Sequence, residues 1–158
     1  MIDIERILLE LEMLPTWDKQ ICLQSFKGNN DPFFGCKHDG RGKVASLHGS
    51  NEHNKKDEDF TELLFDMKYT NSIIKELKMY RTRVMKLKYK TCYTYHRDRT
   101  KRIHIPLITN ENCFIILDKE VCHYPADGNW FLVDTTKKHT AVNASWKDRI
   151  HIVGLTNA

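Results

Sequence analysis

The sequence lacks a long apolar run, a secretion signal and any pair of closely spaced cysteines. No apolar stretch approaches the roughly 20 residues that a membrane-spanning helix requires. The N-terminal segment carries Asp3, Glu5 and Glu10, whereas a secretory signal needs positive charge followed by a continuous apolar segment. We therefore expect no contact with a membrane and a place in the cytoplasm.

Cysteine usage favours the same compartment. The chain has five cysteines, an odd number, and no Cys-x-x-Cys motif. Small secreted proteins that depend on disulfides use even numbers of cysteines in a regular framework. We therefore expect free, partly buried thiols at Cys22, Cys36, Cys92, Cys113 and Cys122.

The charge balance makes a nucleic-acid partner unlikely to be required. The net charge is +4 with a pI near 8.8, and the Lys and Arg residues are scattered rather than massed. A nucleic-acid surface needs a concentrated basic patch. At 158 residues, of which 41% are apolar, the chain has the size of one soluble domain with its own core.

The first 80 residues predict a helical support and a loop. Apolar residues recur at helical spacing from about Asp3, a suitable N-cap, to Pro15. Further patterns predict a strand over Gln20–Phe26, a helical turn or two over Phe60–Met67, and a helix from Thr70 or Asn71 to Met79.

A polar stretch, Lys27–Asp59, interrupts this region. It is rich in Gly, Asn, Asp and Lys and is too long for a plain connection. Two interpretations stay open. The stretch is either a lid over a functional site, with Phe33, Phe34 or Arg41 reaching toward a substrate, or a surface insertion remote from that site.

From residue 81 onward the pattern changes to eight short strands separated by turn residues. They are predicted at Arg83–Lys88, Thr91–His96, Arg102–Ile108, Cys113–Asp118, Glu120–Tyr124, Asn129–Asp134, Thr140–Asn143 and Arg149–Leu155. This pattern is typical of a double-stranded β-helix, the cupin-like jelly roll. We expect one α+β domain over 1–158, mainly β, in which the helices and loop of 1–80 pack on a jelly-roll core of 81–158.

One face of the predicted barrel carries chemistry. His96 and Asp98 are two residues apart, so in extended backbone their side chains leave the same face. The same alternation places Arg102 and His104 on one face of a strand and Ile103, Ile105 and Leu107 on the other. Joined by a second imidazole, His96 and Asp98 form a 2-His-1-carboxylate set, which holds Fe(II) and leaves about three positions open.

The second half of this pattern follows downstream, where His139 precedes Arg149 by ten residues. With these residues, the chain resembles the aspartyl/asparaginyl β-hydroxylases, a family of 2-oxoglutarate- and Fe(II)-dependent oxygenases, over residues 81–155. The resemblance rests on His96-Arg97-Asp98, Arg102-Ile103-His104-Ile105-Pro106-Leu107, Asp127-Gly128, His139-x-x-x-Asn143 and Arg149-Ile150-His151.

The resemblance implies a role for each matched residue. His96, Asp98 and His139 would be the metal ligands and the catalytic centre. Arg149 would hold the distal carboxylate of 2-oxoglutarate, because a guanidinium grips a carboxylate through two parallel hydrogen bonds. Arg102, His104 and Asn143 would line the cosubstrate site, and molecular oxygen would be the second cosubstrate. His123 and His151 are predicted to be structural.

The chain departs from the family's membrane-anchored animal members, which lack the metal-binding carboxylate that Asp98 supplies here. It is closer to the small stand-alone bacterial and phage members, so the expected location becomes the host cytoplasm if a phage encodes it. Two substrates stay open: a free amino acid or a small derivative of one, and an Asp, Asn or Pro side chain within a protein.

Two other functions are kept as alternatives. A non-catalytic cupin-like module would bind a metal or ligand without turnover. An oxygenase of nucleic acids or nucleotides would use the Lys and Arg around Lys75–Lys90, where Tyr80, Tyr89 and Tyr93 interleave. A solvated helix face and an edge strand produce the same interleaving, so the pattern does not favour this last alternative.

Overall fold

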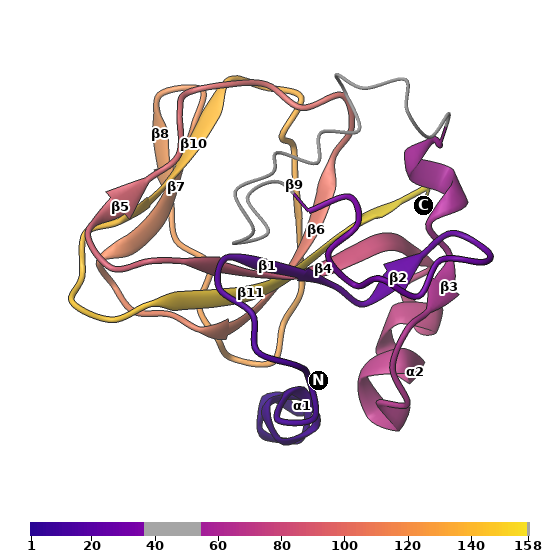
Figure 1. The fold of residues 1–158 in the computed structure, drawn as a ribbon. Coiled ribbons are helices and arrows are strands. Elements are labelled where there is room, and N and C mark those ends of the chain that lie inside the picture. The colour runs from indigo at the N-terminus through magenta and orange to yellow at the C-terminus, as the bar shows by residue number, and fades with distance from the viewer. Residues whose placement is uncertain (37–54, 158) are drawn as a thin grey trace.

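The computed structural model describes residues 1–36 and 55–157 (Figure 1). Arg41 and the centre of the predicted covering loop lie outside the described residues. Two antiparallel sheets dominate the fold, and two α-helices lie below the larger sheet in the view of Figure 1. None of the described helices is long and apolar enough to cross a membrane.

The strand order defines the architecture. The five-stranded sheet has the order β1 (Gln20–Cys22), β4 (Met79–Leu87), β11 (Arg149–Thr156), β6 (Arg102–Ile108) and β9 (Phe131–Val133). The four-stranded sheet has the order β5 (Thr91–Cys92), β10 (His139–Asn143), β7 (Cys113–Leu117) and β8 (Glu120–Cys122). From β4 to β11 the chain crosses between the sheets after every strand except β7, which pairs with β8. This winding is a double-stranded β-helix, so the predicted jelly roll is confirmed.

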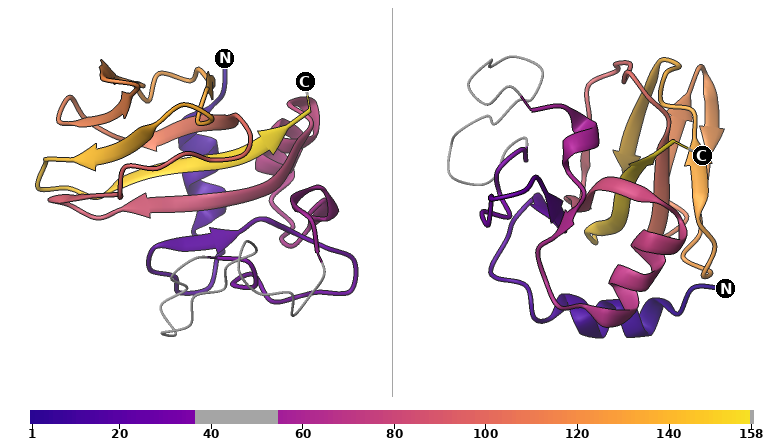
Figure 2. Two further views of the ribbon diagram at one scale, coloured as in Figure 1. Left: turned by 90° about the horizontal axis from the view of Figure 1, so that it is seen from above. Right: turned by 90° about the vertical axis from the view of Figure 1, so that its right-hand side faces the viewer.

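The outer face of the larger sheet carries the main core. Val84, Ile105 and Ile152 come from three neighbouring strands and pack with Ile7 of α1 (Ile4–Leu11) and Ile74 of α2 (Lys68–Glu76). Figure 2 shows both helices beside this sheet in two further views. Each fully buried side chain of this kind contributes about 1.5–3 kcal/mol to folding. The helices therefore serve as the support that the sequence predicted.

The inner face carries a smaller apolar cluster and most of the polar side chains. Leu87 and Val133 pack there with Ile115 and Ala141 of the opposite sheet. Because side chains alternate along a strand, the neighbours of the outer-face residues point into the barrel. The predicted division of β6, with Ile103, Ile105 and Leu107 in the core and the alternate residues elsewhere, is confirmed.

The predicted helical turns over Phe60–Met67 are wrong. A short 3-10 turn, η1 (Asp57–Asp59), precedes β3 (Glu62–Leu63), which pairs with β2 (Gln24–Ser25). The backbone N–H of Leu64 donates to the carbonyl of Leu23 at 3.0 Å, so its hydrogen bond goes to a neighbouring strand rather than to a helical turn. Phe60 and Met67 are both buried, and their spacing imitated a helix.

Two further boundaries differ from the prediction. The predicted strand Gln20–Phe26 is divided between β1 and β2, which belong to different sheets. Helix α2 begins earlier than predicted, at Lys68, and ends at Glu76. Lys78 has φ 50°, a left-handed conformation that ends the helical path, and Met79 already belongs to β4.

A carboxylate from α1 caps α2. Asp3 caps α1 as predicted, accepting from the Arg6 N–H at 3.1 Å, but Met67 at the start of α2 has no capping side chain. The carboxylate of Glu10, from α1, supplies the missing cap. It accepts from Tyr69 N at 2.8 Å, Thr70 N at 2.7 Å and Thr70 Oγ1 at 2.7 Å. Burial acts to raise the pKa of Glu10, but these hydrogen bonds outweigh it and the pKa lies below its usual value.

We expect Glu10→Gln to lower the free energy of unfolding by about 1–2 kcal/mol, because the amide brings an N–H toward backbone donors. Urea unfolding near pH 7 measures the change. Glu12→Gln is the matched control, since Glu12 is exposed at the end of the same helix. The depressed pKa of Glu10 stabilises the fold above the ordinary Glu value, so the gap between Glu10→Gln and wild type should shrink as pH falls through the native pKa. An equal loss in both variants would contradict the capping role.

Candidate metal centre

Two backbone segments bring the three predicted metal ligands together. His96 and Asp98 lie in the connection between β5 and β6, and His139 is the first residue of β10. His96 N donates to His139 O at 2.9 Å, and His139 N donates to His96 O at 2.8 Å, so the connection is joined to the strand by an antiparallel bridge. Asp98 N is held by Thr135 O at 2.9 Å.

The side chains of this trio converge. One ligand atom from each of His96, Asp98 and His139 lies within 4.8 Å of the other two. The imidazole rings have their centroids 4.5 Å apart. Within residues 1–36 and 55–157, this is the one group of three His, Cys, Asp or Glu side chains with such geometry. The spacing in sequence therefore predicted a real cluster, although His96 and Asp98 lie outside the regular strands.

Backbone carbonyls orient both imidazoles. His96 Nδ1 lies 2.5 Å from Thr94 O, and His139 Nδ1 lies 2.9 Å from Lys137 O. A carbonyl oxygen only accepts, so Nδ1 carries the hydrogen in each ring. In a neutral ring the lone pair is then on Nε2, and both Nε2 atoms face Asp98. Metal-binding histidines in proteins are commonly oriented in this way.

Arg102 holds the carboxylate of Asp98. Its Nε donates to Asp98 Oδ2 at 2.7 Å, while His139 Nε2 lies 3.5 Å from Oδ2 and His96 Nε2 lies 3.8 Å from Oδ1. Burial acts to raise the pKa of Asp98, but the charge and hydrogen bond of Arg102, with smaller contributions from both histidines, hold it below its usual value. Asp98 is therefore an anion at neutral pH, as a metal ligand must be.

The centre is open on one side. His139 is 8% exposed and Asp98 18%, whereas the side chain of His96 is 40% exposed. Side-chain exposure therefore increases from His139 on β10 to His96 in the β5–β6 connection. A ligand at this centre would therefore be accessible from the side of His96.

Arg149 is a buried cation with no acidic partner among the described residues. It is 3% exposed, its Nε has no hydrogen-bond partner, and no carboxylate of the described residues contacts its guanidinium. Burial lowers its pKa from the usual Arg value. Arg149 lines a narrow cavity with His151, Cys113 and Tyr124 on the inner face of the barrel. Burying an unpaired guanidinium costs several kcal/mol, so the position is strained unless an anion joins it.

His104 and His151 form a neutral pair beside these cations. Their Nδ1 atoms are 3.2 Å apart, so one ring donates and the other accepts. Burial is the main reason that the pKa of each lies well below its usual value, and nearby arginines add to it. His151 Nε2 has no partner among the described residues. His151, predicted to be structural, thus stands on the same inner face as His104.

Arg83 was not among the site residues predicted from the sequence. Its residue is 6% exposed, Nη1 donates to Gln20 Oε1 at 3.1 Å, and Nε has no hydrogen-bond partner. Burial lowers the pKa of Arg83 and the charge of Arg102 adds to the effect. Val153 of β11 pairs with Arg83 of β4 on one side and with His104 of β6 on the other. The three side chains therefore point inward at the same level of the sheet. The alternation of β4 with buried Val84 was the signal that could have found it.

Asn143 has structural partners. Its Nδ2 donates to Leu87 O at 3.0 Å and Lys147 O at 2.8 Å, and its Oδ1 accepts from Ser145 N at 3.0 Å and Ser145 Oγ at 2.7 Å. These bonds hold the turn between β10 and β11. The predicted role of Asn143 at the cosubstrate stays a prediction.

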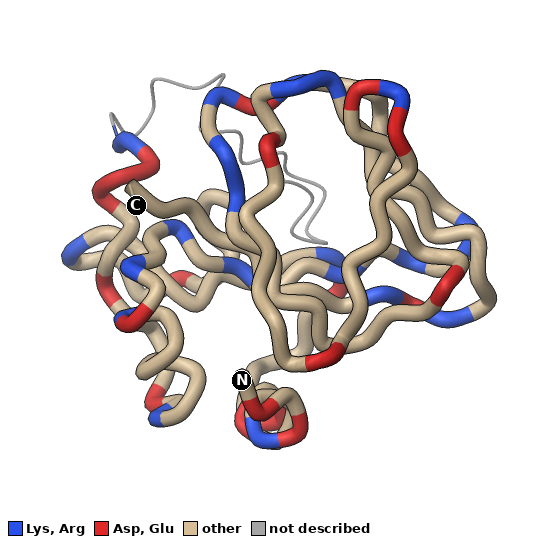
Figure 3. The backbone as a smooth tube through the Cα atoms, turned by 180° about the vertical axis from the view of Figure 1, so that it is seen from behind, with Lys and Arg blue, Asp and Glu red and all other residues tan. Residues whose placement is uncertain are grey.

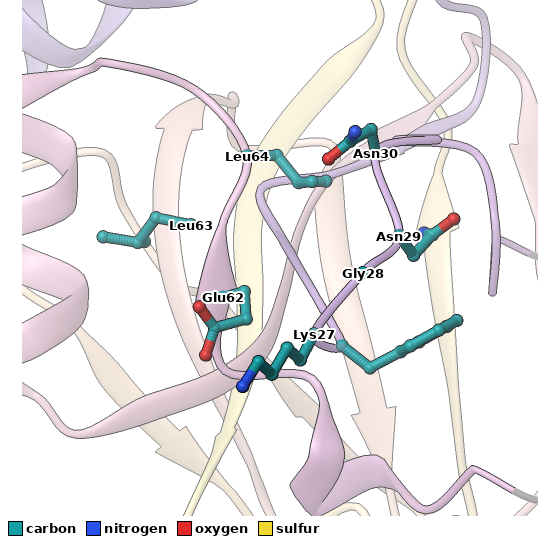
Figure 4. A pocket seen from close by; sticks show the side chains of 8 residues that line it. Lys27, Gly28, Asn29, Asn30, Glu62, Leu63 and Leu64 are labelled. Carbon is teal, nitrogen blue, oxygen red and sulfur yellow. The ribbon is translucent and has the colours of Figure 1, made fainter.

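A more open pocket lies elsewhere, between the turn after β2 and strand β3 (Figure 4). Its side chains come from Phe26, Lys27, Asn29, Asn30, Glu62, Leu63 and Leu64, with Gly28 in the turn. None of the predicted site residues lines it. It offers no set of converging metal donors, so the His–Asp cluster is the better candidate for chemistry.

The described part of the predicted lid packs locally. Phe33 packs against the main core, and the ring of Phe34 meets that of Phe26 edge to face at 5.3 Å. In the view of Figure 3, the Lys and Arg positions of the described residues are interspersed with Asp and Glu positions along the backbone. This distribution gives no support to a nucleic-acid surface on the described residues.

Together, the strand order and the cluster define a class: a double-stranded β-helix protein with two histidines and an aspartate converging beside the barrel. The sequence model of the aspartyl/asparaginyl β-hydroxylases matches residues 39–154, well over half of the chain. The chain belongs to the aspartyl/asparaginyl β-hydroxylase family. The match begins at residue 39, so it also includes part of the N-terminal half that the resemblance by motif, over residues 81–155, left out.

Two solved structures are similar to part of this chain. The plu4264 protein from Photorhabdus luminescens is 12% identical over 48% of this chain, with a TM-score of 0.39. A cupin 2 conserved barrel domain protein from Salinispora arenicola is 13% identical over 49% of this chain, with a TM-score of 0.40. The matched parts span 61% and 62% of those chains, less than two thirds of each. Among curated proteins, none matches this sequence.

We expect His96→Ala, Asp98→Ala and His139→Ala each to weaken Fe(II) binding by about 100-fold or more, because each removes one donor of three. Anaerobic calorimetry with Fe(II) measures the affinity. His123→Ala is the control, since His123 is an exposed imidazole outside the trio. Wild-type affinity in His139→Ala would exclude this metal centre.

Proposed function

We propose that this protein is a 2-oxoglutarate- and Fe(II)-dependent oxygenase that hydroxylates an amino acid or an amino-acid side chain in a protein. One observation carries the proposal. Two imidazoles with Nδ1 committed to carbonyls turn their Nε2 atoms toward one carboxylate, and the three ligand atoms lie within 4.8 Å of one another. Lone pairs and a negative charge at this spacing repel one another unless a cation lies between them.

The donor set fits Fe(II). His96, His139 and Asp98 supply two neutral nitrogens and one oxygen, and a 2-His-1-carboxylate set of this kind is typical of non-haem iron oxygenases. Arg102 would keep Asp98 ionised and fix its orientation. When bound, Fe(II) with 2-oxoglutarate and oxygen supplies the oxidation that converts a substrate C–H to C–OH, with release of succinate and carbon dioxide.

The buried cations fit a dicarboxylate cosubstrate. Arg83, Arg102 and Arg149 face the inner side of the barrel, and among the described residues only Asp98 makes an ion pair with one of them. A dianion near Arg102 and Arg149 would compensate part of the excess charge. Arg149 suits the carboxylate farther from the metal, because its guanidinium is buried and its Nε has no hydrogen-bond partner among the described residues. The charges of Arg149 and Arg102 both act on His104 and lower its pKa. As a neutral side chain, His104 would line the path between these two arginines.

Arg83 favours a substrate that itself carries a carboxylate. Its Nη1 donates to the neutral amide of Gln20, and its Nε has no hydrogen-bond partner among the described residues. It lies on the inner face at the level of His104 but two strands away, toward the edge formed by β1. A substrate carboxylate placed there would compensate a charge that the cosubstrate does not reach. Free amino acids and acidic side chains both meet this condition.

Turnover provides the direct test of the proposal. Protein loaded with Fe(II) should form succinate from 2-oxoglutarate in air and add one oxygen atom to a member of a panel of amino acids and of Asp-, Asn- or Pro-containing peptides. Succinate is followed by NMR and the product by mass spectrometry, with His139→Ala as the inactive control. Fe(II) binding without succinate or oxygenated product over the whole panel would favour the cupin-like binding module instead.

Arg149→Lys separates charge from geometry at the cosubstrate site. Lysine keeps the charge but loses the planar fork, so we expect the KM for 2-oxoglutarate to rise about tenfold or more, equivalent to about 1.4 kcal/mol. Arg99→Lys is the control, because Arg99 is exposed in the connection before β6. An unchanged KM in Arg149→Lys would mean that another cation binds the distal carboxylate of 2-oxoglutarate, with Arg102 the first candidate.

A further inference from the structure

Cys22 and Cys36 form a buried pair of thiols outside the metal centre. Their Sγ atoms are 3.4 Å apart, and the residues are 1% and 0% exposed. Cys22 is on β1, and Cys36 ends the turn that starts at Asp31. The turn is held to the strand because Cys22 N donates to Pro32 O at 2.8 Å. Two sulfurs 14 residues apart in sequence are thus kept in contact by backbone bonds.

Two arginines, Arg83 and Arg81, lie near this pair. Cys22 is opposite Arg83 in the pairing of β1 with β4. Arg81 has φ 49°, beside the register shift of β4, and its Nη2 donates to Gly35 O at 3.2 Å, next to Cys36. The hydrogen bond from Cys36, with smaller contributions from Arg83 and Arg81, lowers the pKa of Cys22, whereas that bond and burial raise the pKa of Cys36. Cys22 is therefore the thiol of this pair that ionises first, because Arg83 and Arg81 favour its thiolate.

We propose that Cys22 and Cys36 are a reversible oxidation site, converted to a disulfide by hydrogen peroxide. The Cys22 thiolate attacks one oxygen of the peroxide, the O–O bond breaks, and a sulfenic acid forms as hydroxide leaves and takes a proton to become water. The Cys36 sulfur then attacks the Cys22 sulfur, the S–O bond breaks, and a second water leaves with the Cys36 proton. In total, two thiols lose two electrons and two protons to one peroxide, and the products are one disulfide and two waters.

The geometry requires little movement. A disulfide needs the sulfurs at about 2.05 Å, so they must approach by a little over 1 Å from their present contact. The cross-link would fix the Asp31–Cys36 turn to β1, at the edge of the inner face that carries Arg83. Oxidation would also remove the Cys22 thiol, which lies opposite this arginine in the pairing of β1 with β4.

Peroxide treatment of the full, metal-free chain tests the proposal. Protein kept with a chelator is exposed to hydrogen peroxide, quenched, denatured, alkylated and mapped by mass spectrometry. We expect a Cys22–Cys36 disulfide, a fall from five alkylatable thiols to three, and full recovery with dithiothreitol. Cys113 is the matched control, because it is also buried, at 4%, but donates to Asn143 Oδ1 at 3.3 Å and has no thiol neighbour.

The rate at which each thiol is lost, and the cysteine with which it forms a disulfide, decide the outcome. Cys22 and Cys36 should be lost together, about tenfold faster than Cys113, while Cys92→Ser leaves this loss unchanged and Cys22→Ser removes the disulfide. The wild-type result stands without the variants if Cys22→Ser does not fold. The proposal is overturned if Cys22 and Cys36 stay alkylatable while exposed Cys92 is oxidised, or if either forms its disulfide with another cysteine.

Discussion

The two backbone hydrogen bonds between His96 and His139 are the interaction on which the site depends. They join the β5–β6 connection to the start of β10, and Thr135 holds the same connection through Asp98 N. Each imidazole then donates to a backbone carbonyl two residues away. The ligand geometry is thus determined by the main chain, because His96, Asp98 and His139 have little freedom left once the sheets have formed.

The two faces of the larger sheet divide stability from function. Its outer face packs apolar side chains such as Ile105 and Ile152 against the helices, each contributing about 1.5–3 kcal/mol. Its inner face buries Arg83 and Arg149, which have no anionic partner among the described residues, at a cost of several kcal/mol each. The outer core makes this cost tolerable, and the excess positive charge prepares the barrel for anionic ligands.

Much of the site followed from local sequence, because alternation along a strand is a local property. The spacing of Arg102 and His104 against Ile103, Ile105 and Leu107 gave both faces of β6 before any pairing was known. The turns over Phe60–Met67 were predicted wrongly, since the backbone there pairs with β2. Arg83 and the contact of Cys22 with Cys36 were missed, because they depend on which strands become neighbours and on their register. The family match confirms the resemblance that the ordered motif predicted.

The most direct measurement is a crystal structure of the full chain grown without oxygen in the presence of Fe(II) and 2-oxoglutarate, with anomalous data at the iron edge. We predict one iron peak bonded to His96 Nε2, His139 Nε2 and an oxygen of Asp98, and a dicarboxylate whose far end meets the Arg149 guanidinium. An iron peak away from this trio, or a dicarboxylate that leaves Arg149 without a partner, would contradict this prediction.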